Sequence, residues 1–143
     1  MSPTHPKKSE SEGRGAGNES VHGARSDSAP PPYASEEALL ETLTRPSPAL
    51  TAWVRAVDSD LTVVGAGGKM GPTLCVLAAN AFRAAGADRR VLAVSRFRDA
   101  GVRAWLERNG VCTRVCDVLA PAARRRLPQG GRVVYLTGRK FGT

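Results

Sequence analysis

The sequence has no isoleucine, few aromatic residues (two Trp, two Tyr, three Phe) and no apolar run near the roughly 20 residues that cross a bilayer. Its two histidines, His5 and His22, both lie near the N-terminus, and its three cysteines, Cys75, Cys112 and Cys116, form no CxxC or Cys/His spacing. These shortages argue against a membrane span, a disulfide framework and a zinc site. They favour a reducing, cytoplasmic location.

The net charge of +8 comes entirely from the part of the chain that follows residue 34. Residues 1–34 hold four basic and four acidic side chains, which leaves 17 basic and nine acidic ones in the remainder. The basic residues are spread over several expected elements, and only Arg124, Arg125 and Arg126 form a run, with no aromatic residues between them. The pattern therefore favours a solvated arginine-rich surface over nucleic-acid binding.

Residues 1–34 are built mainly from Ser, Gly, Pro and Glu and contain almost no large apolar side chain. Such a segment buries too little surface to offset its ordering entropy, so we expect a disordered tail. Residues 35–57 predict a helical N-terminal extension, with Ser35 as the N-cap of its first helix. The second helix has an apolar stripe at helical spacing, formed by Leu50, Trp53, Val54 and Val57.

Residues 58–143 alternate short apolar runs with helical stretches. We expect strands at 61–64, 91–94, 111–117 and 132–136, and helices at 69–85, 99–108 and 121–127. This alternation predicts parallel βαβ units, and continuous apolar strands predict a sheet covered on both faces. The fold class is therefore α/β: a Rossmann-like parallel sheet with helices on both faces, truncated after the fourth strand.

The expected strand order 3-2-1-4 leaves the fourth strand at one edge of the sheet. Unpaired edges recruit other chains, so we expect self-association through residues 133–136. Cys112 and Cys116 would share one face of the third strand as small core residues, and Tyr135 would pack within the fourth strand.

A glycine cluster separates the first strand from its helix, with the spacing Gly65-x-x-Gly68-x-x-Gly71. Main-chain N–H groups at a helix N-terminus bind pyrophosphate, and glycines allow close approach because they lack a Cβ atom. In this context the cluster favours dinucleotide binding over a purely structural turn. A P-loop is excluded, because Met70 stands where a magnesium-binding Ser or Thr is needed.

This spacing resembles that of the NAD-dependent epimerase/dehydratase family, the extended short-chain dehydrogenase/reductases typified by UDP-glucose 4-epimerase. Asp117-Val118, after the third strand, is similar to the pair that contacts adenine in that family, and the segment 136–140 is similar to one that follows the cofactor. The likeness covers about residues 60–143. It implies pyrophosphate contacts from Gly65, Gly68, Lys69, Met70 and Gly71, adenine contacts from Asp117 and Val118, and ribose–phosphate contacts from Leu136, Thr137, Gly138 and Lys140.

Two features depart from this family. An acidic residue usually ends the second strand and binds the ribose hydroxyls, whereas this chain has Ser95 and Arg96. An arginine there suits a 2′-phosphate, although it is equally consistent with a solvated loop charge, so the cofactor is expected to be NAD or NADP. The family's Tyr-x-x-x-Lys pair lies beyond the fourth strand, and Tyr135 is followed four residues later by Arg139 instead.

The leading interpretation is the NAD(P)-binding portion of an epimerase/dehydratase-like protein acting on a sugar or nucleotide-sugar, without its catalytic half. The alternative is a non-enzymatic dinucleotide-binding sensor or regulatory module. Both interpretations assign the dinucleotide to the same residues.

Overall fold

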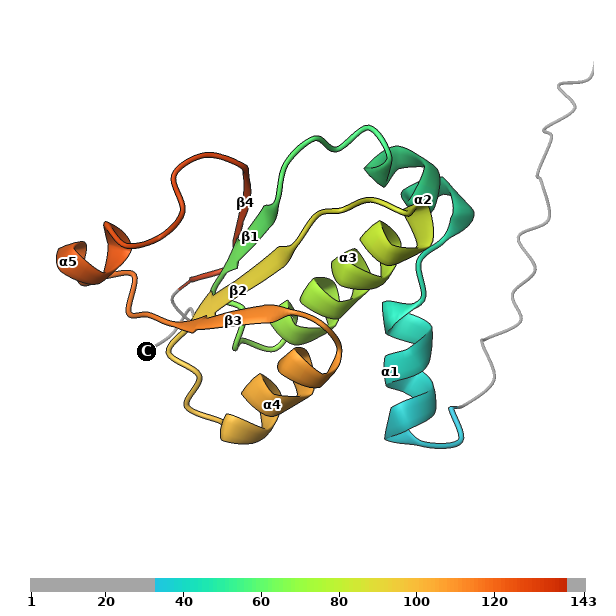
Figure 1. Ribbon diagram of the computed structural model, residues 1–143. Coiled ribbons are helices and arrows are strands. Elements are labelled where there is room, and N and C mark those ends of the chain that lie inside the picture. The colour runs from blue at the N-terminus through green and yellow to red at the C-terminus, as the bar shows by residue number, and fades with distance from the viewer. Residues whose placement is uncertain (1–32, 139–143) are drawn as a thin grey trace, which may run out of the picture. The chain divides into compact units, whose positions relative to one another are not determined.

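The computed structural model describes residues 33–138, whose helices and strands are shown in Figure 1. The expected tail, apart from Tyr33 and Ala34, and the expected contact from Lys140 lie outside the described residues. No helix in the described part of the chain has the length and apolarity of a membrane span.

Four parallel strands form one sheet in the order β3-β2-β1-β4. The strands are β1 (Leu61–Val64), β2 (Val91–Ser95), β3 (Cys112–Val115) and β4 (Arg132–Tyr135). The register places Val63 between Ala93 and Val134, and Val64 between Val94 and Tyr135. The α/β class, the parallel pairing and the position of the fourth strand at an edge are confirmed.

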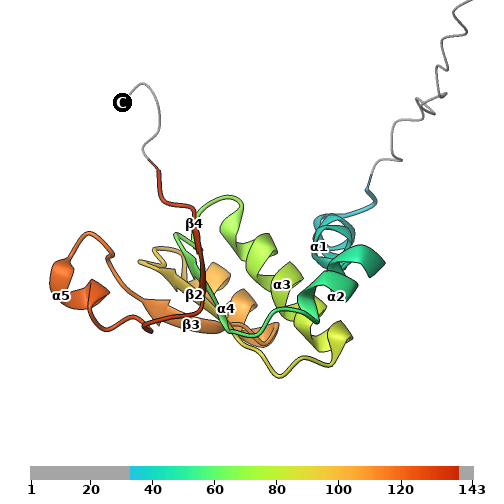
Figure 2. The same cartoon turned by 90° about the horizontal axis from the view of Figure 1, so that it is seen from above.

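Two helices cover the first face of this sheet, α3 (Gly71–Ala85) and α4 (Ala100–Arg108). Two shorter helices, α1 (Glu36–Thr44) and α2 (Pro48–Val54), contact α3 on its side away from the strands, as Figure 2 shows. The one-turn helix α5 (Pro121–Arg124) lies on the other side of the sheet.

Local chemistry explains where these helices begin and end. Ser35, Ser47 and Asp99 cap α1, α2 and α4, each accepting a main-chain N–H of the first turn with its side-chain oxygen. Pro72 lies in the first turn of α3, where the missing N–H costs no helical hydrogen bond. Gly86 ends α3 in the left-handed conformation, with φ of 65°.

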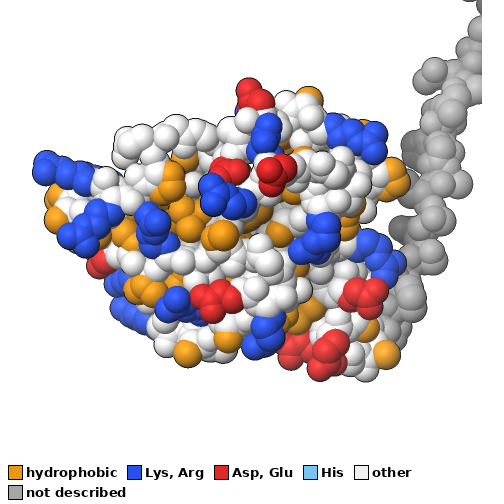
Figure 3. Space-filling view, viewed as in Figure 1, with side chains coloured by type: hydrophobic (Ala, Val, Ile, Leu, Met, Phe, Trp, Pro, Cys, Tyr) orange, Lys and Arg blue, Asp and Glu red, His pale blue; other side chains and the backbone are white. Residues whose placement is uncertain are grey.

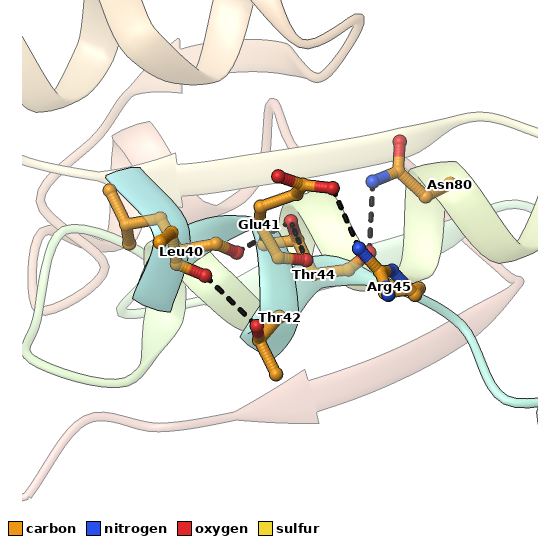
Figure 4. A network of polar contacts seen from close by, with 7 residues as sticks. Leu40, Glu41, Thr42, Thr44, Arg45 and Asn80 are labelled. Carbon is orange, nitrogen blue, oxygen red and sulfur yellow. Dashed lines mark hydrogen bonds and ion pairs between the residues drawn. The ribbon is translucent and has the colours of Figure 1, made fainter. Parts of the chain in front are cut away.

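Polar contacts tie α1 to α3 (Figure 4). The side-chain amide of Asn80 donates to the carbonyl oxygen of Thr44 over 2.9 Å, and the Thr44 hydroxyl donates to the Leu40 carbonyl. Arg45 pairs with Glu41 one turn earlier. The C-terminal end of α1 is therefore held on α3 by a hydrogen bond as well as by packing.

The main core lies between the first face of the sheet and its two long helices. Val63, Val91 and Ala93 point from the strands into it, and Phe82 and Leu106 meet them from α3 and α4. All five side chains are buried. Burial of this apolar surface is the main stabilising contribution to the domain.

A smaller core lies on the second face. Val64, Val94 and Cys116 are its buried apolar side chains, with Ala123 and Leu127 from the α5 segment packed against them. The remainder of this face carries no helix within residues 33–138.

Figure 3 shows hydrophobic side chains exposed among scattered Lys and Arg side chains on the visible side of the molecule.

Two expectations about packing, those for Cys112 and Tyr135, are wrong. Cys112 is exposed and Tyr135 is 61% exposed, because both lie on the second face beyond the reach of α5. Trp53 is 62% exposed, because α2 ends at Val54 and the following turn carries Val57 into the core in its place.

Candidate functional site

A cavity of about 600 Å³ lies at the carboxyl ends of the four strands. Because the strands are parallel, the segments that follow them meet at this edge of the sheet, and the strand order reverses between β1 and β4. The lining comes from all four segments: 65 and 67–68 after β1, 94–99 and 102 with the end of β2, 116–119 after β3, and 135–138 at the end of β4.

Two glycines of the cluster are required by the fold. Gly65 has φ of 86°, and a Cβ atom there would lie 2.8 Å from Cγ2 of Thr137. A Cβ atom on Gly71 would lie 2.6 Å from Cα of Ala66. The absence of a side chain at Gly65 therefore allows the end of β4 and Thr137 to lie against the loop. Its absence at Gly71 allows α3 to begin directly against Ala66.

The other two glycines shape the cavity. A Cβ atom on Gly68 would lie 3.3 Å from the Gly65 carbonyl oxygen, a tight contact but not the overlap found at Gly65 and Gly71. Gly67 lies against β2, and a Cβ atom there would come within 2.7 Å of Oγ of Ser95. Both glycines line the cavity, so their bare main chain forms part of its wall.

The main-chain N–H groups of this loop divide into two sets. Those of Gly65 and Ala66 donate to the Val94 carbonyl oxygen, and that of Gly68 donates to Gly65. Two expected contact positions, Gly65 and Gly68, therefore have main-chain donors that are already engaged.

The second set has no partner. Within residues 33–138, the N–H groups of Gly67, Lys69, Met70 and Gly71 make no hydrogen bond to another protein group. Met70, the N-cap of α3, provides no side-chain cap, in contrast to the capping residues of α1, α2 and α4. The N-terminus of the 15-residue helix α3 thus keeps free donors and its positive dipole end.

The segment after β2 brings two arginines to the cavity. Arg96 and Arg98 are both exposed and line it, with the half-buried Phe97 between them. Phe97 has φ of 42°, a conformation that is strained for an aromatic residue. Oδ1 of Asp99 accepts the N–H groups of the first turn of α4.

The segments after β3 and β4 complete the wall. Oδ1 of Asp117 accepts the Leu119 N–H over 3.0 Å, which fixes a tight turn, and Val118 packs on the smaller core. The Leu136 N–H donates to the Val64 carbonyl, so that β4 stays paired with β1 up to the cavity and Thr137 meets Gly65.

The structure brings most of the predicted site residues together. Gly65, Gly68, Ser95, Arg96, Asp117, Val118, Leu136, Thr137 and Gly138 line the cavity. Lys69, Met70 and Gly71 belong to the adjoining loop and helix start and do not line it.

Sequence reasoning missed several cavity residues. Gly67 belongs to the cluster, and its contact with Ser95 depends on tertiary packing that spacing does not reveal. Arg98 and Asp99 could be identified from the sequence as polar residues that follow a strand. Nothing in the sequence pattern identified Phe97 or Leu119 as residues of the cavity. Tyr135, expected as a packing residue, also lines the cavity.

The groups with shifted pKa values lie away from this cavity. Burial raises the pKa of Cys75 in α3 to about 12, so its thiol is neutral and structural. Hydrogen bonds from Thr113 and then Arg103 lower the pKa of Glu107, where α4 meets β3. Nowhere among the described residues do three His, Cys, Asp or Glu side chains gather as metal ligands would.

The fold and cavity together define a Rossmann-like α/β domain, with a glycine loop and an uncapped helix N-terminus at the carboxyl edge of its sheet. Comparison with protein-family models, curated proteins and solved structures finds no significant match to this chain.

Proposed function

We propose that this chain binds a dinucleotide, NAD or NADP, in the cavity at the carboxyl ends of its strands. The observation that carries this proposal is the set of four unpartnered N–H groups in residues 67–71, at the start of α3. Such donors, together with the helix dipole, favour a pyrophosphate anion. The cavity adjoins this loop at the carboxyl ends of the four strands, and the strand order reverses between β1 and β4.

The remaining lining suits the two ends of such a ligand. Val118 and Leu119 offer an apolar surface to an adenine ring, beside the carboxylate of Asp117. Thr137 and Gly138, beside the glycine loop, would contact the nicotinamide half. The cofactor would supply hydride transfer, while these residues would bind it and orient it.

The wider role we propose follows from the resemblance in residues 60–143. The domain would serve as the cofactor-binding portion of an epimerase/dehydratase-like protein that acts on a sugar or nucleotide-sugar. We place it in the cytoplasm, because three free cysteines, one of them exposed, suit a reducing compartment.

Calorimetric titration of the full chain with NAD and NADP tests the proposal. Gly68→Val is expected to abolish binding, because its side chain would occupy the cavity wall where a phosphate approaches. Gly68→Ala is expected to weaken binding by a smaller factor, because it adds a single methyl group.

The thermal midpoint of both variants should fall only slightly, since the backbone of Gly68 is unstrained and an added Cβ atom would meet only the Gly65 carbonyl oxygen, at 3.3 Å. Ala52→Val, on the exposed face of α2, is the matched control and should leave affinity unchanged. The proposal fails if the parent chain binds neither dinucleotide, or if a folded Gly68→Val variant binds as tightly as the parent.

A further inference from the structure

We propose that the cavity selects a dinucleotide with a phosphate on the adenosine 2′ position, NADP, over the unphosphorylated NAD. This inference rests on the proposed dinucleotide site and adds to it the identity of the preferred ligand. Four features of the residues that follow β2 and β3 carry it.

The first feature is the side chain at the end of β2. In dinucleotide-binding domains of this kind, an acidic residue near this position binds the ribose 2′-hydroxyl. Here the strand ends at Ser95, whose Oγ lies beside Gly67 of the glycine loop. A hydroxyl donates to a phosphate dianion, which a carboxylate at the same place would repel.

The second feature is the pair of arginines that follows. Arg96 and Arg98 line the cavity and are exposed. In the described part of the chain neither makes an ion pair or a side-chain hydrogen bond, in contrast to Arg45, Arg90 and Arg103. An unengaged guanidinium offers a planar set of donors that matches a phosphate bidentately.

The third feature is that the nearest acidic side chains accept hydrogen bonds from the main chain of their own turns. Asp99 accepts the N–H groups of Gly101 at 2.8 Å and Val102 at 3.4 Å as the cap of α4. Asp117 accepts the Leu119 N–H in its own turn. Both carboxylates line the cavity, Asp99 at the start of α4 and Asp117 after β3, and each accepts main-chain N–H groups of its own turn.

The fourth feature is the arrangement of charge. The two basic side chains flank Phe97 directly after β2, whereas Asp117 stands after the neighbouring strand β3. The segment directly after β2, where the ribose 2′ position would lie in a domain of this kind, therefore carries two basic side chains.

Titration of the full chain with NADP and NAD in separate experiments, at one fixed salt concentration, tests this inference. We expect NADP to bind at least about 10-fold more tightly, the factor that one or two charge-assisted hydrogen bonds provide. Arg96→Ala should weaken NADP binding about 10- to 100-fold and change NAD binding less than about threefold.

Arg89→Ala is the matched control, because Arg89 carries the same charge just before β2, at the opposite end of the strand, and within residues 33–138 its side chain donates a hydrogen bond to the adjacent Asp88 carbonyl alone. This variant should preserve the preference. Arg96→Asp should reverse it in favour of NAD, because a carboxylate accepts ribose hydroxyls and repels phosphate.

The outcomes separate this inference from the function on which it rests. Equal or tighter binding of NAD by the parent overturns the 2′-phosphate preference while leaving the dinucleotide site intact. Binding of neither ligand overturns both. A preference for NADP that survives Arg96→Ala and Arg96→Asp unchanged overturns the assignment to the segment after β2.

Discussion

The two faces of the sheet differ in how completely they are covered. On the first face, α3 and α4 enclose a core that contains most of the fully buried side chains, including Val63, Val91 and Leu106. On the second face, the short α5 segment covers only the part around Val94 and Cys116.

The two faces therefore contribute to different properties, the first mainly to the stability of the domain and the second mainly to contact with other chains. The first face contributes most of the buried apolar area, so it sets the stability of the domain. The second face leaves Val133 and Tyr135 of β4 each 61% exposed, at an edge whose outer main-chain groups are not paired with another strand of the described sheet. That combination favours contact with another chain.

The largest expected effect comes from truncating one apolar side chain on each face. Leu106→Ala should lower the free energy of unfolding by about 3 kcal/mol, because it opens a cavity in the larger core. Val133→Ala should lower it by less than about 0.5 kcal/mol, because that side chain is already exposed. Urea denaturation of both variants measures the difference, and similar losses would show that the two faces are equally important.

A smaller effect is expected on self-association through β4. Two copies paired antiparallel about Val134 would place Val133 of each opposite Tyr135 of the other, an apolar pair on the second face. Val133→Lys should weaken this association about 10-fold, as edge lysines do by opposing strand pairing. Sedimentation velocity over a concentration series measures it.

Leu43→Lys is the control for this variant, because it places the same charge on an exposed apolar position of α1, away from the sheet. It should leave association unchanged. A parent chain that stays monomeric at every concentration would rule out the β4 contact.

The smallest expected effect concerns thiol reactivity alone. Cys112, exposed on the second face, should react rapidly with an aromatic disulfide reagent at pH 8. Cys75 should react only on unfolding, because burial keeps its pKa at about 12 and its thiol protonated. Loss of the rapid phase in Cys112→Ser identifies the residue, and rapid labelling of Cys75 would show that the first face opens readily.

The fold was predictable because its local signals agree with one another. Short apolar runs alternate with capped helices, Pro72 fits only a first turn, and Gly86 marks a helix end. Parallel pairing and strand order then follow from connection length and handedness.

Coverage of the second face was not predictable in the same way. An apolar strand has the same pattern whether or not a helix lies over it, so Cys112 was expected in the core and Tyr135 was expected as a packing residue of the fourth strand. Their exposure depends on the length of α5, which reaches only the end of the sheet near Val94.

The candidate site was predictable where sequence spacing determines position, as for Gly65, Gly68 and Ser95. It was not predictable where tertiary contacts decide, as for Gly67 against Ser95 or the positive φ of Phe97. The division of the loop's main-chain donors also required the structure, because the Val94 carbonyl takes two of them across the sheet.

The contact between Gly71 and Ala66 has a consequence for the energetics of any anion received at the start of α3. Main chain rests on main chain there, so the loop is already fixed in shape before a ligand arrives. Little conformational freedom of the loop remains to be lost on complex formation, so less of the attraction between anion and N–H groups is offset by ordering the protein.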